Sequence, residues 1–596
     1  MIRVADYVID KIVKCGIKHI FMVTGRGILY LTDAVAKNKN ITAVSTYHEQ
    51  GASYAAMAYA AATDGMAACL VSTGCAAANA VTAALCAYQD NLPVIFISGQ
   101  NMLNETTKYT GVDIRTFGSQ EADIIPVVAS VTKYATMLTS ADSAADELNK
   151  AIKIANDGRK GPVWIDIPLD IQNARLDETK SDILGQSNNK VSASTKEIST
   201  VVDEFKMASR PIIFIGGGIR SAEAIDEVKK FVELNGIPLV YSTAAADAYG
   251  SGHKLSIGAV GSLGGSRAGN FAVQNADYIL AIGTKLCSQS IGESKQFARG
   301  AKVVVVDIDE IEHTKKGPRI DRVIISDARE FLKSLNSRNI ELQIDEWVLK
   351  CQHWKEIFAV KNEVHITELI SQNKIDLYNF ADVISDFLPD DASVITDAGL
   401  EELIIPSAVR YRENQRCLFP AAQGAMGYAI PAILGAHYAG KENIVTVVGD
   451  GSIMMNIQEL QLIGNYRIPA KIFVINNNMY AVIRKRQHDL FRNRTIGNDP
   501  SDGVPAPDFE KLAYAFGLEY KKIGCERELA EGIRDTLNAE GPCMCEVMCV
   551  EDQKYLHTSF AFTDKRRLVK RPLEDLSPFI DRELFKSEMI VNPIEE

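Results

Sequence analysis

Two polar motifs, one strand–helix–strand unit apart, supply oxygen atoms suited to a divalent cation. Gly-Asp-Gly-Ser at 449–452 follows the apolar run IVTVV, and the next apolar run, KIFVI, ends in Asn-Asn at 476–477. Asp450 and Asn477 should therefore emerge together at the carboxyl edge of one parallel sheet. A carboxylate, an amide oxygen and a nearby backbone carbonyl are hard ligands of the kind that Mg²⁺ prefers. A Gly-Asp-Gly turn alone is common after a strand, but the second motif at this interval favours a metal site.

A second candidate for chemistry is a glutamate between a strand-like and a helix-like segment. Glu49, in the run His-Glu-Gln-Gly at 48–51, follows ITAVSTY and opens the small-residue segment ASYAAMAYAAA. At such a junction a carboxylate could point into a ligand cleft and transfer a proton. A glutamate in the first turn of a helix is more often there because it favours the helix dipole.

The elements that position these residues follow an α/β pattern. Short apolar runs alternate with helical patterns, as at 67–73, 93–99, 211–217, 277–283, 302–309, 443–450 and 471–477. Continuous apolar strands separated by helices predict parallel sheets covered on both faces. We expect three consecutive doubly wound parallel-sheet domains, at 1–175, 195–340 and 370–560, followed by a C-terminal tail at 561–596. Two polar or weakly patterned stretches, 174–197 and 340–375, are the predicted linkers.

Composition narrows the class of protein. The chain has 596 residues, of which 46% are hydrophobic and 23% charged, as in ordinary soluble globular proteins. A net charge of −12 argues against a nucleic-acid partner, which requires a basic surface. The 11 cysteines are scattered without C-x-x-C pairs, and no apolar run reaches the ~20 residues of a membrane span. The N-terminus also lacks the apolar core of a signal peptide, so we expect a cytoplasmic protein without a membrane partner.

Together the two motifs resemble those of the thiamine-diphosphate-dependent enzymes, whose signature is GDGS followed at a similar interval by NN. The resemblance implies that Asp450, Asn477 and the backbone carbonyl of Met479 bind Mg²⁺. The run HEQGA, at 48–52, is similar to the catalytic glutamate motif of the acetolactate synthase branch. It implies that Glu49 protonates N1′ of the cofactor's aminopyrimidine.

The resemblance to acetolactate synthase-like proteins continues over most of the chain in the same order. The similar stretches are 72–79, in place of a TSGPGATN loop, and 90–100, 118–135, 161–172, 396–399 and 420–436. Met426 resembles the residue that wedges the cofactor into its bent shape, and Gln120 and Lys133 are candidate polar groups near the donor substrate, Gln120 as a catalytic residue. The implied ligands of thiamine diphosphate are Gly25, Asn79, Gly399, Gln423, Met426, Gly449, Gly451, Ser452 and Asn477.

The middle block carries a weaker signal for a nucleotide. Three glycines at 216–218 follow the strand PIIFI, Asp307 ends the strand VVVV, and Arg267 follows a glycine-rich stretch. Glycine-rich turns can hold a diphosphate and a strand-end acid can hold a ribose. In acetolactate synthases this region holds FAD, so Gly217, Arg267 and Asp307 are candidate FAD ligands. ADP, or no nucleotide at all, remains the alternative.

Three departures from the family pattern concern the substrate. Leu400-Glu401 stands where the family has Gln-His beside the diphosphate, Ser119 replaces a Phe, and Arg486 replaces the Trp that selects the second keto acid. An acid beside a diphosphate would be repelled, so we expect Glu401 to turn away or to meet a basic group. A smaller wall and a cation suggest an anionic or sugar-linked acceptor. The basic run 484–486 could instead be a solvated helix face.

The sequence thus predicts an enzyme that decarboxylates a 2-oxo acid, with pyruvate as the expected donor, and joins the remaining unit to an acceptor carbonyl. A simple decarboxylase, a flavin-dependent enzyme of the pyruvate oxidase kind and an inert regulatory paralogue are the alternatives. In the family each cofactor lies between the first block of one subunit and the third block of its partner, which implies a homodimer or homotetramer. The tail at 572–593 resembles those of proteins from sugar and polysaccharide pathways, or is a strap on the subunit.

Overall fold

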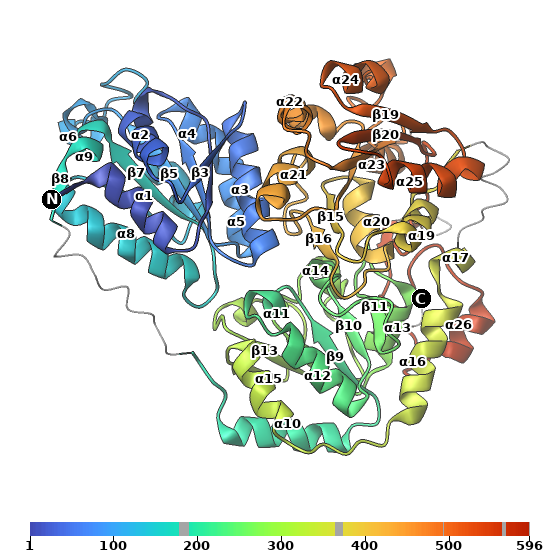
Figure 1. The fold of residues 1–596 in the computed structure, drawn as a ribbon. Coiled ribbons are helices and arrows are strands. Elements are labelled where there is room, and N and C mark those ends of the chain that lie inside the picture. Colours follow the sequence, from blue (N-terminus) through green and yellow to red (C-terminus); the bar gives the residue numbers. More distant parts are fainter. Residues whose placement is uncertain (178–189, 364–373, 493, 563–567, 595–596) are drawn as a thin grey trace.

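The computed structural model describes residues 1–177, 190–363, 374–492, 494–562 and 568–594. It contains three six-stranded sheets in which every pairing is parallel, and helices cover the sheets (Figure 1). This is the predicted α/β architecture of three doubly wound domains. Half of the predicted linker 174–197, residues 178–189, and residues 364–373 of the second, 340–375, lie outside the described residues. Helix α16 (Asp345–Ile357) occupies part of the second.

The first and third sheets share one topology. The first contains β2 (His19–Met22), β3 (Thr42–Ser45), β4 (Ala67–Val71), β5 (Val94–Gln100), β6 (Tyr134–Met137) and β7 (Val163–Pro168), in the order β3-β2-β4-β5-β7-β6. The third contains β15 (Ser393–Thr396), β16 (Arg416–Leu418), β17 (Ile444–Gly449), β18 (Lys471–Asn476), β19 (Glu519–Ile523) and β20 (Cys543–Met548), in the order β16-β15-β17-β18-β20-β19. In both, the strand order reverses between the first and third strands. Ligands of open α/β sheets bind outside the carboxyl ends at such a point.

The middle sheet has a different order. It contains β9 (Pro211–Ile215), β10 (Leu239–Tyr241), β11 (Ser256–Ala259), β12 (Tyr278–Ile282), β13 (Lys302–Asp307) and β14 (Arg322–Ile325), in the order β11-β10-β9-β12-β13-β14. This order is that of dinucleotide-binding folds, with the switch point between β9 and β12. Fold alone does not establish that a nucleotide binds there.

Strand residues of the first domain alternate between two apolar layers. Ile20 and Ile95 face the layer that contains α1 (Val4–Lys14) and α8 (Ala141–Asn156). Phe21 and Phe96 face the layer that contains α3 (Glu49–Thr63) and α5 (Val81–Asp90). This second layer continues into the third domain through α21 (Ala429–Tyr438), so the two domains share one apolar core.

Helices α3 and α21 lie side by side between the first and third domains (Figure 1). Their backbones approach closely at Gly435, where an added Cβ would lie 2.2 Å from the carbonyl oxygen of Ala55 and 2.7 Å from the Cβ of Ala58. No side chain fits there, so a small-residue helix at 49–63 is needed for docking as well as for burial. Because α3 begins at Glu49, this contact also fixes the position of the candidate catalytic acid.

An ion-pair network joins the three domains. Arg416 of β16 contacts Asp64 at the end of α3, at 3.1 Å, and Asp247 of the middle domain, at 3.1 Å. Arg220 of α11 (Gly218–Ser221) contacts Asp247 at 2.9 Å. Burial raises the pKa of Asp247, but the two arginines outweigh burial and hold that pKa below its ordinary value. The negative charge of the buried Asp247 therefore depends on both Arg220 and Arg416.

Replacing Arg416 with Met is expected to destabilise the protein by about 1–3 kcal/mol, because it leaves buried acceptors with fewer donors. The midpoint of guanidinium-induced unfolding would measure the loss. Arg534→Met serves as the control, because Arg534 is more than half exposed and forms only long ion pairs. A midpoint for Arg416→Met that equals the control's would show that the network does not stabilise the domain arrangement.

The C-terminal residues pack on the middle domain. Glu574 is fully buried and contacts Gln274 at 2.6 Å and Arg299 at 2.7 Å. Helix α26 (Arg582–Glu588) ends at Glu588, which accepts a hydrogen bond from Trp354 of α16 at 2.8 Å. The segment is therefore an integral part of the subunit. Within the described ranges, no helix is long and apolar enough to cross a membrane.

Candidate functional site

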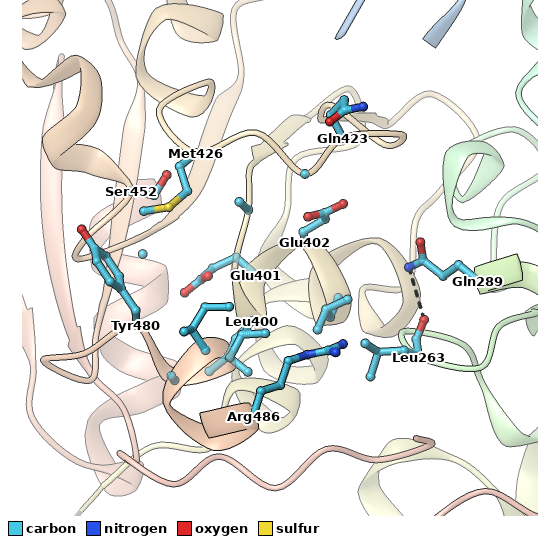
Figure 2. A pocket seen from close by; sticks show the side chains of 18 of the residues that line it. Leu263, Gln289, Leu400, Glu401, Glu402, Gln423, Met426, Ser452, Tyr480 and Arg486 are labelled. Carbon is cyan, nitrogen blue, oxygen red and sulfur yellow. Dashed lines mark hydrogen bonds between the residues drawn. The ribbon is translucent and has the colours of Figure 1, made fainter. Parts of the chain in front are cut away.

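A cavity of about 650 Å³ opens at the carboxyl edge of the third sheet (Figure 2). Asp450, Asn477 and Met479 line it, together with residues that follow β15. Loops of the middle domain close one side at Ser262, Leu263 and Gln289, and the C-terminal segment adds Ser559 and Lys570. The cavity thus lies at the point where the strand order of the third sheet reverses, as the fold requires of a ligand site.

The three predicted metal ligands converge on this cavity. Asp450 is 4% exposed, and its Oδ2 accepts hydrogen bonds from the backbone N–H groups of Asn477, at 3.1 Å, and Asn478, at 2.5 Å. Asn477 Oδ1 accepts one from the backbone N–H of Met479 at 3.2 Å. Burial raises the pKa of Asp450 to about 6. A carboxylate, an amide oxygen and a backbone carbonyl held in one turn are a donor set that fits Mg²⁺.

The residues predicted to hold the cofactor's diphosphate lie around the same turn, but Gly451 and Ser452 also have partners within the protein. Position 451 must be glycine because an added Cβ would lie 2.0 Å from the ring of Tyr480. Ser452 donates a hydrogen bond to Asp397 at 2.7 Å and accepts one from the N–H of Gly427 at 2.9 Å. Its hydroxyl therefore orders the loop that carries Met426, and its backbone remains the part available to a ligand.

Met426 and Gln423 come from the loop before α21 (Figure 2). Met426 lines the cavity on the same side as Ser452. Gln423 also lines the cavity, but its side-chain amide donates to Gln89 of the first domain at 2.7 Å. Gln423 thus connects the cavity to the first domain.

Glu401 differs from the expectation that it turns away or meets a basic group. It lies in the first turn of α20 (Leu400–Ala408), is 3% exposed and lines the cavity, and none of the described basic residues forms an ion pair with it. An added Cβ on Gly449 would lie 3.3 Å from both of its carboxylate oxygens. Gly399, at a φ of 121°, also makes room for it, since an added Cβ there would lie 2.4 Å from Oε2. Burial, followed by the charges of Asp397 and Asp450, raises the pKa of Glu401 to about 8.

The candidate residues of the first domain form a separate group at the carboxyl edge of the first sheet. Asn79 donates a hydrogen bond to Glu49 Oε2 at 3.0 Å. The carbonyl of Gln120, a residue with a φ of 64°, lies against Gly74, in the turn that precedes the helix of Asn79. Gly25 lies against Ser72 at the same edge. Among the described residues, none from this group lines the cavity of the third domain.

Glu49 is held in place from the third domain of its own chain. Glu459 accepts hydrogen bonds from the backbone N–H groups of Tyr47, at 3.2 Å, and His48, at 3.1 Å. Gly51 leaves the space that this carboxylate fills. No local pattern of residues predicts this role of Glu459, because its partners are about four hundred positions away in the chain.

A buried network behind Gln120 is a second feature that the sequence analysis missed. Asp166 of β7 accepts hydrogen bonds from Ser98, at 2.7 Å, and from Gln100, at 3.2 Å. Gln100 Oε1 in turn accepts one from Thr73 at 3.0 Å, and Thr73 lies 3.5 Å from the carbonyl of Gln120. The available signal was a polar residue inside an apolar strand, VWIDIP, since buried polar groups there need partners.

Lys133 and Arg267 are engaged elsewhere. The ammonium of Lys133 donates hydrogen bonds to the backbone carbonyls of Ile154 and Asp157. The side chain therefore holds the end of α8 and is not directed at Gln120. Arg267 is 2% exposed and pairs with Glu363 at 2.9 Å and with the carbonyls of Leu576, at 3.3 Å, and Pro578, at 3.0 Å. Its guanidinium therefore fastens the C-terminal segment, and its predicted contact with a flavin diphosphate would require it to exchange these partners.

The other two middle-domain candidates have mixed surroundings. Gly216 and Gly218 are required by the protein, because an added Cβ on either would lie within 2.6 Å of the Gly283–Thr284 backbone. At Gly217 an added Cβ meets nothing closer than 3.6 Å, which leaves room for a ligand. Asp307 contacts His313 at 2.9 Å and accepts a hydrogen bond from the backbone N–H of Asp309 at 3.1 Å, so both of its carboxylate oxygens already have partners.

Comparison with known proteins agrees with this arrangement. The chain matches the family models of the thiamine pyrophosphate enzymes, with the N-terminal TPP binding domain at 2–124, the central domain at 198–335 and the C-terminal TPP binding domain at 397–547. Its relatives include the acetolactate synthase large subunit of Lactococcus lactis subsp. lactis, 28% identical over 93% of each chain. The acetolactate synthase of Arthrospira platensis is 29% identical over 91% of this chain and 94% of its own. Acetolactate synthase 1 of Zea mays is 28% identical over 93% of this chain and 86% of its own.

The chain therefore belongs to the thiamine pyrophosphate enzyme family, within which it is acetolactate synthase-like. It is an enzyme that depends on thiamine diphosphate.

Proposed function

We propose that this enzyme decarboxylates a 2-oxo acid, with pyruvate as the donor, and transfers the remaining two-carbon unit to an acceptor carbonyl. The observation that carries the proposal is the cavity at the switch point of the third sheet, where Asp450, Asn477 and Met479 present hard oxygen atoms. The acetolactate synthase relatives support the coupling of decarboxylation to carboligation.

In this proposal the chain's own residues bind, orient and transfer protons. Asp450, Asn477 and the Met479 carbonyl would hold Mg²⁺, and the turn at 449–452 would hold the diphosphate. Bound thiamine diphosphate supplies an electron sink for the electron pair left by departing CO₂. Glu49, oriented by Asn79, holds and transfers a proton at N1′ of the aminopyrimidine. Gln120 orients the donor carboxylate or carbonyl.

The proposal requires two copies of the chain. The Glu49 group lies outside the cavity that contains Asp450 within one described subunit. A complete site forms when the first sheet's edge of one copy covers the cavity of a second, related by a twofold axis. This supports a homodimer, or a homotetramer built from such dimers.

The acceptor in this proposal is anionic. Arg486 of α23 (Ala481–Phe491) and Lys570 of the C-terminal segment line the cavity, and in Figure 2 the guanidinium of Arg486 lies toward the middle-domain side. A cation that lines the same cavity as Asp450 would bind a phosphate or a carboxylate of the acceptor.

Replacing Arg486 with Gln is expected to raise the KM for an anionic acceptor at least about tenfold, because a charge-assisted hydrogen bond contributes ~1.5–3 kcal/mol. Glyceraldehyde 3-phosphate and glyceraldehyde, each supplied with pyruvate, are the probes, and products are identified by mass spectrometry. Lys485→Gln on the same helix is the control, since Lys485 pairs with Asp489 and is not a wall residue. Equal losses with both probes would contradict an anionic acceptor.

For the middle domain we propose a nucleotide, FAD or ADP, at the carboxyl edge of β9 and β12 beside Gly217. The support is the strand order and the space at Gly217. The visible absorbance spectrum and the acid-released small molecules of the purified protein distinguish the two.

A further inference from the structure

Glu401 is a buried carboxylate, and none of the described Lys, Arg or His side chains forms an ion pair with it. Among the described residues, only its own backbone N–H favours its charged form, while Asp397 and Asp450 oppose it. In Figure 2 its side chain extends toward the side of the cavity lined by Ser452 and Tyr480. A buried charge is stable only when an opposite charge or several hydrogen bonds compensate it. Without such compensation the carboxyl stays protonated, and a cation in the cavity would supply the compensation that keeps it ionised.

The position of this carboxylate indicates which group that is. Its two oxygens lie against Gly449, the residue directly before Asp450, on the cavity side of the turn. Glu401, Asp450, Asn477 and Met479 all line this one cavity, so two carboxylates, an amide oxygen and a backbone carbonyl are available to a ligand there. Such a set of hard oxygen donors suits a divalent cation, and its two negative charges bind a cation more tightly than one.

We propose that Glu401 binds a divalent cation together with Asp450, so that the chain holds the metal before thiamine diphosphate arrives. The inference rests on the metal site of the proposed function but not on the reaction. In this role Glu401 attracts the cation to the site. The bound cation then offsets the negative charge of the carboxylates, which would otherwise repel the diphosphate.

The neighbouring Glu402 provides a matched control. It lines the same cavity, but its carboxylate lies against Gly424, where an added Cβ would be 2.2 Å from Oε2. The charges that influence it most are those of Asp397 and Asp90, not that of Asp450. Glu402→Gln therefore removes a neighbouring, partly buried acid from the cavity without removing a group that lies against the turn of Asp450.

The test is Mn²⁺ binding to the full-length, metal-free protein without thiamine diphosphate, followed by the electron paramagnetic resonance signal of free Mn²⁺. The wild type should bind one Mn²⁺, Glu401→Gln should weaken binding at least about tenfold, and Glu402→Gln should not. Glu401→Asp should recover part of the affinity, which shows that the carboxylate and not folding is responsible. Thermal unfolding of each variant checks the fold.

Wild-type affinity in Glu401→Gln would overturn the inference, because Gln mimics a protonated, metal-free Glu401. Equally weak Mn²⁺ binding in Glu402→Gln would also overturn the inference, because the loss would then reflect the total negative charge of the cavity and not a contact of Glu401 with the metal. Failure of the proposed function is a separate result: Glu401-dependent Mn²⁺ binding without CO₂ release from pyruvate would sink the function and leave this inference standing.

Discussion

Replacing Glu49 with Gln should lower the rate of CO₂ release from pyruvate about 10²–10⁴-fold, the range that general acid–base assistance contributes. Glutamine can still accept the hydrogen bond from Asn79, so the geometry at the start of α3 is kept while the transferable proton is lost. The assay is CO₂ release with added thiamine diphosphate and Mg²⁺. Affinity for the cofactor should change little, because Glu49 acts on its proton and not on its diphosphate.

Glu510→Gln is a suitable control for this substitution, since Glu510 is exposed on α24 (Phe509–Ala515). A Glu49→Gln variant that releases CO₂ at the wild-type rate would refute the assignment of the acid. Absence of release from the wild type, if it binds the cofactor, would reject pyruvate as donor and leave other 2-oxo acids to be tried.

Asp450→Asn should weaken binding of Mg²⁺ and thiamine diphosphate by about 100-fold or more, because even groups that only support metal ligands contribute 10–100-fold. Asparagine can still accept the backbone hydrogen bonds of Asn477 and Asn478, so the turn should keep its shape. Isothermal titration calorimetry with the cofactor and Mg²⁺ together measures the loss. Asp552→Asn, at an exposed position, is the control.

The two inactive variants also test the arrangement of the site between subunits. If Glu49 of one copy serves the metal turn of the other, coexpressed Glu49→Gln and Asp450→Asn chains form mixed dimers with one intact site each. Random pairing then restores about a quarter of wild-type activity. No recovery, with mixed dimers demonstrated by mass spectrometry, would mean that each site is built within one chain.

The sequence alone determined the architecture and the metal turn. Continuous apolar strands separated by helical segments predicted three parallel sheets, because the period of apolar residues is a local property of the chain. The interval from Asp450 to Asn477 predicted that both side chains leave one sheet edge, because a crossover between neighbouring parallel strands has a narrow range of lengths. The parallel pairing of β17 with β18 places them in this way.

Only the tertiary structure decided which partners the charged side chains have. Arg267 follows a glycine-rich stretch that suits a diphosphate, yet carbonyls some three hundred positions later bind its guanidinium. Glu401 was expected to turn away from the site or to meet a basic group, yet the absence of side chains at Gly399 and Gly449 lets it line the cavity without an ion pair to a described residue. The close packing at Gly435 and the contact of Glu459 with the start of α3 likewise join residues that are far apart in the chain. Such contacts depend on how whole domains dock, and no local pattern of residues encodes them.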